Sequence, residues 1–218
     1  MSQAPESCDL TQAQTIAALQ AALEAERVRA REIDHRAKNS LQLAASLLLL
    51  LSRRSKEPET QRALKAMHQR LGAVAAVHRD ILTADRPERF DLTQFVREHV
   101  TALTEAHEGA AVRLALDPVE VRAAHAGPLA LIVNELTINA LTHGAGGPTG
   151  AQVSLDLRAA DGGFKLIVQD DGPRPPPGPG DAGFGLTMVK LLAQQIGASF
   201  ALEAAQPGVR AVVTAACA

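Results

Sequence analysis

The most informative stretch of the second half of the chain is Asn134–Gly144, which reads NELTINALTHG. Its polar residues Glu135, Asn139 and His143 recur every four positions, so a helix would carry a carboxylate, an amide and an imidazole along one face. An amide oxygen suits Mg²⁺, a hard ion that keeps several waters and bridges phosphate oxygens. The periodicity alone fits an ordinary amphipathic helix equally well.

Two glycine-bearing segments follow this helix. Asp170 and Gly172 come just after the apolar strand 166–168, so a carboxylate at a strand end can accept a hydrogen bond from the exocyclic amine of adenine, and the glycine lets the backbone come close. Gly183 and Gly185 open a helix whose N–H groups and dipole suit polyphosphate. A lone Gly-x-Gly fits a simple loop or helix cap as well. The ordered set of helix, strand, Asp-x-Gly, Pro/Gly-rich loop and Gly-x-Gly indicates a nucleotide pocket.

Helices and strands alternate around these segments, with hairpin-like pairs of strands. This mixture predicts a two-layer α/β sandwich over residues 89–218. A Pro/Gly-rich stretch, 173–180, interrupts it as a mobile loop of partly polyproline character. The pattern predicts helices at 90–103, 126–143 and 184–196, and strands at 112–116, 119–122, 152–158, 164–168, 199–203 and 209–214.

The first half predicts two long helices joined by a short turn at 56–59. Asp9 and Thr11 can cap a helix that meets no Pro or Gly before Pro58. Its apolar positions follow a heptad: Ile16, Leu19, Leu23, Ala30, Ile33, Ala37, Ala44, Leu47 and Leu51. The second helix has a stripe at Leu64, Met67, Leu71, Val74, His78 and Ile81, so we interpret His78 as a core histidine.

One such hairpin leaves its apolar stripe half covered, and pairing two of them gives a four-helix bundle. We therefore expect residues 10–85 to form a homodimerisation domain, and the whole chain to have the α+β class. A hinge is expected at 83–88, where Asp85, Arg86 and Pro87 break the second helix.

His35 lies on the outer face of the first helix, two positions after the core residue Ile33. Asn39 and Gln42 extend the same polar stripe. A nucleophilic imidazole needs such exposure, and the neighbouring Asp34 can orient the ring or accept its proton. On spacing alone, an ordinary solvated histidine is the more common explanation.

The segment Glu32–Gln42, EIDHRAKNSLQ, closely resembles the phosphoacceptor box of the HWE-related HisKA_2-type histidine kinases, His-Arg-x-Lys-Asn-x-Leu-Gln. The segment Arg70–His78, RLGAVAAVH, is similar to the second-helix segment of the same family. The resemblance implies that His35 is the phosphorylated residue. It also implies that neighbouring polar residues help to position phosphate or the partner protein: Arg36, Lys38 and Asn39.

The ordered boxes of the second half resemble the N, G1 and G2 boxes of the GHKL ATPase fold, which histidine kinases share with gyrase, Hsp90 and MutL. This resemblance implies ATP and Mg²⁺ as cofactors. It departs from the family where Arg174 replaces the second glycine of the G1 box. Position by position it implies Asn139 as the Mg²⁺ ligand, Glu135 and His143 near the phosphates, Asp170 as the adenine reader beside Gly172, and Gly183 and Gly185 as phosphate-side lid glycines.

Together, the two resemblances imply a two-component histidine kinase that phosphorylates its own His35 from ATP. The phosphoryl group would then pass to an aspartate of a response-regulator receiver domain docked near Asn39 and Gln42. One alternative is a histidine phosphotransferase relay with a degenerate ATP site, favoured by Arg174 and by the lack of room for a sensor. Another is a non-catalytic GHKL interaction module.

Composition restricts the partners. The net charge is −2, with acids and bases interspersed and no Trp or Tyr, so neither a clustered basic face nor aromatic stacking favours nucleic acid. The apolar run 41–51 is too short to span a bilayer. Cys8 and Cys217 show no metal or disulfide spacing, so we expect a cytoplasmic protein without nucleic-acid or membrane partners. Residues 1–31 leave no room for a folded sensor, so we expect either a separate sensor protein or a truncated chain.

Overall fold

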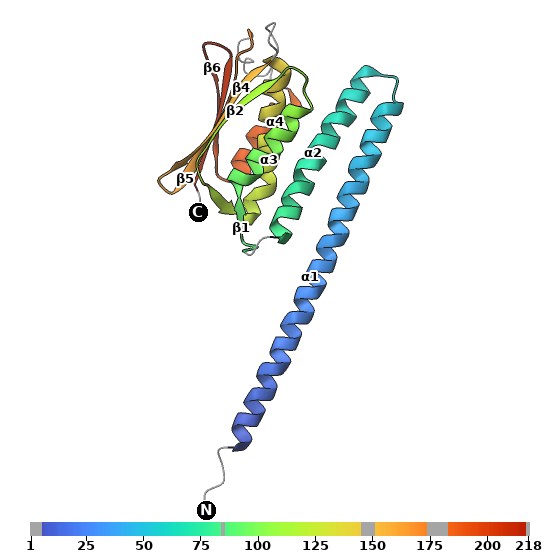
Figure 1. Ribbon diagram of the computed structural model, residues 1–218, viewed down its shortest axis with the longest axis vertical. Coiled ribbons are helices and arrows are strands. Elements are labelled where there is room, and N and C mark those ends of the chain that lie inside the picture. The colour runs from blue at the N-terminus through green and yellow to red at the C-terminus, as the bar shows by residue number, and fades with distance from the viewer. Residues whose placement is uncertain (1–5, 84–85, 145–150, 174–182, 217–218) are drawn as a thin grey trace, which may run out of the picture.

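The computed structural model describes residues 6–83, 86–144, 151–173 and 183–216, without the side chains of residues 6–14, 27, 31, 34, 35, 82 and 83. A long helical hairpin is followed by an α/β unit in which helices cover one face of a sheet (Figure 1). The α+β class and the predicted order of long helices and strands are therefore confirmed. Cys8, the loop around Arg174 and Cys217 lie outside the described side chains.

The hairpin consists of α1 (Glu6–Arg54) and α2 (Pro58–Thr83). With 49 and 26 residues, the two helices are about 73 and 39 Å long at 1.5 Å per residue, so the N-terminal half of α1 projects past α2 as an arm (Figure 1). A polar bond joins the two helices, from His68 Nδ1 to the carbonyl of Ala45 at 2.9 Å, and Gln61 Nε2 donates to the carbonyl of Ser55 in the connecting turn at 2.6 Å. Pro58 opens α2, where a missing N–H costs nothing.

The heptad stripe of α1 is largely uncovered in the single chain. Its large apolar members are at least half exposed: Ile16, Leu19, Leu23, Ile33, Leu47 and Leu51. On α2, the residues buried most deeply are Ala73 and Val77, which belong to the core of the α/β unit. His78 is exposed, so its prediction as a core histidine is wrong for this chain.

The sheet has the strand order β2-β4-β5-β7-β6, and all its pairs are antiparallel except β2–β4. Three helices pack on one face (Figure 1). The strands are β2 (Ala111–Leu116), β4 (Gln152–Ala160), β5 (Gly163–Asp170), β6 (Ser199–Ala204) and β7 (Val209–Ala216), and the helices are α3 (Leu92–Glu105), α4 (Ala123–His143) and α5 (Phe184–Gln195).

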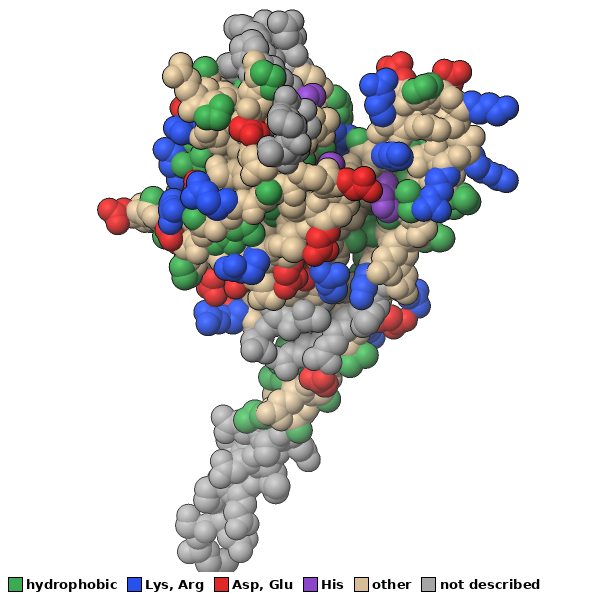
Figure 2. All heavy atoms as spheres, turned by 45° about the horizontal axis from the view of Figure 1, so that its top comes forward, with side chains coloured by type: hydrophobic (Ala, Val, Ile, Leu, Met, Phe, Trp, Pro, Cys, Tyr) green, Lys and Arg blue, Asp and Glu red, His purple; other side chains and the backbone are tan. Residues whose placement is uncertain are grey.

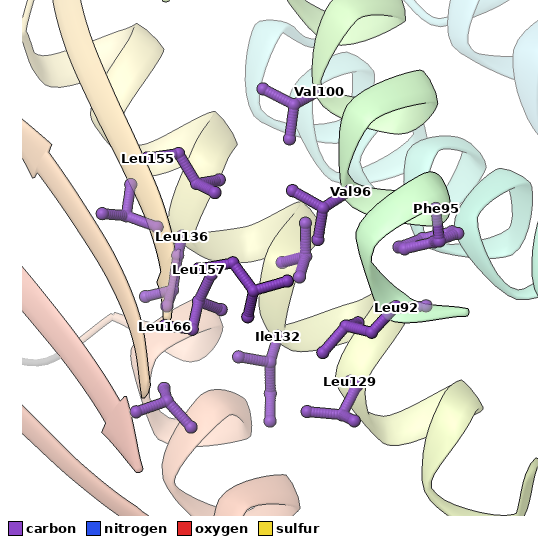
Figure 3. Packing of buried hydrophobic residues seen from close by; sticks show 14 of the residues in the cluster. Leu92, Phe95, Val96, Val100, Leu129, Ile132, Leu136, Leu155, Leu157 and Leu166 are labelled. Atoms are coloured by element: carbon purple, nitrogen blue, oxygen red, sulfur yellow. The ribbon is translucent and has the colours of Figure 1, made fainter. Parts of the chain in front are cut away.

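Alternating residues of the central strands build the core against these helices. Along β5 the buried positions are Phe164, Leu166, Val168 and Asp170, which is the period of two expected of a half-buried strand. Figure 3 shows strand residues such as Leu155, Leu157 and Leu166 meeting helix residues such as Val96 and Ile132. Because Asp170 continues this alternation, its side chain falls on the helix-covered face of the sheet.

A short two-stranded sheet next to the hairpin was not predicted. It pairs β1 (Arg89–Asp91) with β3 (Glu120–Arg122), with Phe90 opposite Val121. We expected Phe90 to begin a helix, but α3 starts at Leu92 because the Asp91 carboxylate caps it, accepting from the Gln94 N–H at 2.9 Å. Of the expected hinge 83–88, residues 84 and 85 lie outside the described part.

Helix α2 lies between α1 and the α/β unit and packs against α4 (Figure 1). Basic and acidic side chains are interspersed over the face shown in Figure 2, as the sequence led us to expect. Within the residues that the structure describes, no helix combines the length and apolar character needed to cross a membrane.

Candidate functional site

A cavity of about 160 Å³ lies at the end of α4, between that helix, the sheet and the start of α5. The structure brings five of the predicted residues together in its wall: Asn139, His143, Asp170, Gly183 and Gly185. The apolar part of the wall was not predicted from the sequence and is formed by Leu136, Ala140, Val168, Leu186, Leu202, Val209 and Ala211. No local signal in the sequence distinguishes such apolar residues of a pocket wall from those of the core.

Asp170 is the buried acidic group of this cavity, with 5% of its surface exposed. Its Oδ1 accepts two backbone hydrogen bonds, from Gly172 N–H at 3.0 Å and from Val209 N–H at 3.3 Å. These bonds fix the carboxylate at the end of β5. Since Oδ1 takes both, Oδ2 is the oxygen suited to accept a hydrogen bond from a ligand.

Two glycines allow the backbone to close around Asp170. A Cβ at Gly172 would overlap the carbonyl oxygen of His143, which explains the glycine in the Asp-x-Gly motif. A Cβ at Gly208 would overlap the carbonyl oxygen of Asp170, and Gly208 has a φ of +86°, which favours glycine. Gly208 was not identified from the sequence, because only the fold brings it to Asp170.

The start of α5 forms the other end of the cavity. Gly183 is its N-cap and has no side chain to satisfy the first N–H groups; the N–H of Thr187 bonds back to the Gly183 carbonyl at 3.2 Å. The N–H groups before Thr187 therefore have no partner within the helix, which suits an anion. A Cβ at Gly185 would lie 2.6 Å from Glu135 Oε2 and 3.9 Å from Asn139 Nδ2, so this backbone approaches both side chains closely.

Glu135 is held from outside the α/β unit. Arg70 of α2 donates from Nη2 to Oε2 at 2.8 Å and from Nε to Oε1 at 3.1 Å, and the two side chains are 15% and 8% exposed. The same guanidinium lies 5.0 Å from the centre of the Phe184 ring. Asn134 Nδ2 adds a bond to Oε1 at 3.0 Å. Both carboxylate oxygens are thus engaged, and Glu135 lies behind Gly185 rather than in the cavity wall.

The polar contacts continue from Glu135 into α3. The His99 Nε2–H donates to the Oδ1 of the fully buried Asn134 at 3.1 Å, and the His99 ring stacks on Phe95. Burial disfavours the charged imidazolium and lowers the pKa of His99, and the hydrogen bond to Asn134 acts in the opposite direction. A chain of hydrogen bonds therefore joins α3, α4 and α2.

The predicted acceptor segment lies on α1. Asp34 and His35 fall within this helix, but their side chains are outside the described part. Arg36 is exposed and pairs with Glu32 at 2.6 Å. The exposure predicted for Asn39 and Gln42 is confirmed.

A groove of about 510 Å³ runs between the two hairpin helices at this level. It is lined by Lys38, Gln42, Ala45 and Ser46 of α1 and by Gly72, Ala75, Ala76 and Arg79 of α2. It shares no lining residue with the cavity at the end of α4. The structure therefore places predicted residues around two separate cavities.

Two family models match the chain. A family model described as Histidine kinase (HisKA_2) matches residues 32–107, and one described as Histidine kinase-like ATPase domain (HATPase_c_2) matches residues 92–211. The chain is 30% identical over 192 residues to a blue-light-activated histidine kinase of Rhizobium johnstonii, covering 86% of this chain and 51% of that protein. It is 31% identical over 147 residues to the sensor histidine kinase PdtaS of Mycobacterium tuberculosis, covering 65% of this chain and 29% of that protein.

The fold resembles that of solved structures. The histidine kinase domain of a blue-light-activated histidine kinase from Erythrobacter litoralis superimposes with a TM-score of 0.64 and 17% identity, over 82% of this chain and 94% of that domain. The chain spans about half the length of the Rhizobium relative and less than a third of the mycobacterial one.

Proposed function

The chain belongs to the histidine kinase family, and on that premise we propose that it uses Mg-ATP to phosphorylate its own His35 and then passes the phosphoryl group to an aspartate of a response-regulator receiver domain. The observation that carries this proposal is the cavity at the end of α4. Residues from distant parts of the sequence, Asn139, Asp170 and Gly185 among them, line one wall there. A relay protein without nucleotide chemistry has no need of such a convergence.

The base of the nucleotide would occupy the deep end of this cavity. Apolar side chains such as Leu136, Val168 and Leu202 would pack on a purine, and Asp170 would accept from its exocyclic amine. The volume of about 160 Å³ is below the roughly 300–1,000 Å³ of pockets that enclose whole ligands, so the phosphates would extend outward toward α5.

The phosphate end offers backbone donors and an amide. The N–H groups at the start of α5 would bind phosphate oxygens beside Gly183 and Gly185, with His143 at the rim of the cavity. Asn139 is half-buried beside Gly185 and would supply an oxygen to Mg²⁺, which in such sites keeps waters and neutralises phosphate charge.

His35 would act as the nucleophile. A neutral imidazole nitrogen would attack the γ-phosphorus of ATP in line, ADP would leave as the bond to the bridging oxygen breaks, and Asp34 would orient the ring or take its proton. Positioning and charge neutralisation supply most of the rate in such transfers, because the transition state is loose. Arg36, Lys38 and Asn39, on the turn after His35, would position the phosphoryl group or the receiver.

The uncovered stripe of α1 supports a homodimer. A second hairpin would cover apolar residues that are at least half exposed in the single chain, such as Leu19, Ile33 and Leu51, and would complete a four-helix bundle. The groove lined by Lys38 and Gln42 is the surface we assign to the receiver domain. We place the reaction in the cytoplasm and assign the input to a separate sensor protein or a further segment of a longer chain.

The test compares His35→Gln with His78→Gln, an exposed histidine on α2. With γ-³²P-ATP, the first variant should lose labelling while its ATP affinity, measured by calorimetry, stays within twofold of wild type. The second should label normally. Labelling that persists in His35→Gln would refute the assigned acceptor. Absence of Mg-ATP binding by the wild-type chain would favour the phosphotransferase relay instead.

A further inference from the structure

Arg70 contacts two elements of the α/β unit from the hairpin. Its guanidinium makes the bidentate pair with Glu135 of α4 and lies over Phe184 at the start of α5. Arginine matches a carboxylate with a planar fork of donors, so the pair fixes orientation as well as distance. With side chains only 15% and 8% exposed, it is screened far less by salt than the exposed Arg36–Glu32 pair of α1.

The contact belongs to a continuous interface. Arg70, Ala73 and Val77 recur at steps of three and four along α2, so they lie on one face of the helix. Ala73 and Val77 are buried in the core of the α/β unit, at 0% and 3% exposure. The hairpin is therefore docked on the α/β unit through one apolar stripe that ends in a charged pair.

In this docked position, the acceptor segment and the phosphate end of the cavity lie at different levels along the hairpin. The hydrogen bond between His68 of α2 and Ala45 of α1 sets the register of the antiparallel helices and places position 35 of α1 level with about position 78 of α2, which is eight positions, or about 12 Å along the axis, from Arg70. Transfer requires the phosphorus within about 3–3.5 Å of the imidazole.

A second copy does not remove this mismatch. A two-fold axis along the bundle leaves the second acceptor histidine at the same level as the first. The α/β unit must therefore move along or away from α2 before transfer, and the Arg70–Glu135 pair must break in that movement.

We infer that Arg70 is a latch: it holds the α/β unit in a parked position on α2 and keeps both oxygens of Glu135 occupied until the unit is released toward His35. The expected effect on autophosphorylation rests on the proposed function. The role of Arg70 in docking the α/β unit on α2 does not. Release would do two things at once. It would free the unit to move, and it would free Oε2 of Glu135, beside Gly185 at the phosphate end of the cavity, while Asn134 keeps its bond to Oε1.

The experiment compares Arg70→Gln with Arg62→Gln in the full chain. Arg62 is also on α2, is exposed and bonds only within its own helix in the part described, to the Pro58 carbonyl at 3.3 Å, so it controls for loss of a helix arginine. Two quantities are measured: the initial rate of autophosphorylation at saturating ATP, and hydrogen–deuterium exchange of the α2 amides 66–80.

Arg70→Gln should raise exchange over 66–80 and should raise the rate by about fivefold or more, a usual coupling between two states, with ATP affinity within twofold of wild type. Arg62→Gln should match wild type in both. Arg70→Lys keeps the charge but loses the fork of donors, so it should fall between wild type and Arg70→Gln and serves if Arg70→Gln is poorly folded.

A slower rate in either Arg70 variant would overturn the latch, because it would make Arg70 a promoter of the reaction. Exchange equal to that of Arg62→Gln would overturn it as well. If the wild-type chain incorporates no label, the proposed function fails, and the difference in exchange between the two arginine variants still decides whether Arg70 holds the docked position.

Discussion

The two ends of the cavity are built in different ways. At the base end, Asp170 is fixed by backbone N–H groups of Gly172 and Val209, and all three residues belong to the α/β unit. At the phosphate end, Glu135 beside Gly185 is held by Asn134 of its own helix and also by Arg70, which belongs to the hairpin. On the proposed function, base recognition would therefore be built into the α/β unit, whereas the phosphate end would also depend on where that unit is docked.

This difference fits a kinase whose nucleotide unit travels. A unit that moves between positions must keep its ligand, so contacts to the base should not depend on the hairpin. Groups that assist phosphoryl transfer are needed only when the α/β unit is near His35. Pairing Glu135 with Arg70 in the docked position would therefore suppress reaction of the nucleotide away from His35. Substitutions at the base end should therefore change stability or ATP affinity, whereas substitution of Arg70 should change the rate of autophosphorylation.

Gly208→Ala should produce the largest effect, a loss of about 3 kcal/mol in the free energy of unfolding, measured by urea denaturation. The added Cβ overlaps the Asp170 carbonyl oxygen, which is backbone and cannot move aside, and the φ of +86° is itself unfavourable for alanine. Gly162→Ala is the matched control: its φ is +69° but no atom lies within 4 Å of the new Cβ, so it should cost about 1 kcal/mol. Equal losses in the free energy of unfolding for the two variants would mean that the backbone around Asp170 shifts to make room for the new Cβ.

Asp170→Asn should weaken ATP binding by about 50-fold, or about 2.3 kcal/mol, measured by calorimetry. The amide oxygen can keep both backbone hydrogen bonds, but the amide nitrogen replaces the second acceptor, and a donor cannot pair with the exocyclic amine of adenine. Asp171→Asn is the control, because Asp171 accepts from the Gln152 N–H at 3.0 Å and lies outside the cavity wall. A similar loss in both variants would remove Asp170 from base recognition.

The sequence predicted polar residues at both ends of the cavity but not the long-range contacts that hold them, for a physical reason. Asp170 and Gly172 are two residues apart after a buried strand, so a local pattern marks them. Arg70 and Glu135 are 65 residues apart, and nothing in either segment indicates that they meet. Arg70 was noted only as part of a family-like segment, and its contact with the α/β unit is a property of the docked fold.

The same distinction between local patterns and long-range contacts explains the errors in the predicted fold. The strand β1 (Arg89–Asp91) exists because it pairs with residues 120–122, and three residues are too few to show a period of their own. The apolar pattern of α2 placed His78 inside, whereas tertiary packing selected the face that carries Ala73 and Val77. Long periodic helices and alternating strands were predictable because their signal repeats within the element itself.

His99 lies at the far end of the hydrogen-bonded chain that begins at Arg70, so it tests how that side of the molecule responds to pH. Burial lowers the pKa of His99 below 6.5, and Arg79, Asp80 and Glu98 line the same small cavity beside it. As the pH falls below about 6.5, the unfolded chain binds a proton that the folded chain resists, so stability present above that pH is progressively lost.

His99→Gln keeps an amide donor for Asn134 but cannot titrate, so it should remove this part of the loss. The free energy of unfolding, measured from pH 8 to pH 5.5, should fall less steeply in the variant than in wild type. At pH 8 His99 is neutral in both states, so the difference in free energy of unfolding between wild type and His99→Gln reflects packing alone. This difference should narrow or reverse as the pH is lowered. Parallel profiles would mean that His99 takes up its proton as readily in the folded chain as in the unfolded one, and the hydrogen-bonded chain from α3 to Arg70 would then have to tolerate a charged imidazolium.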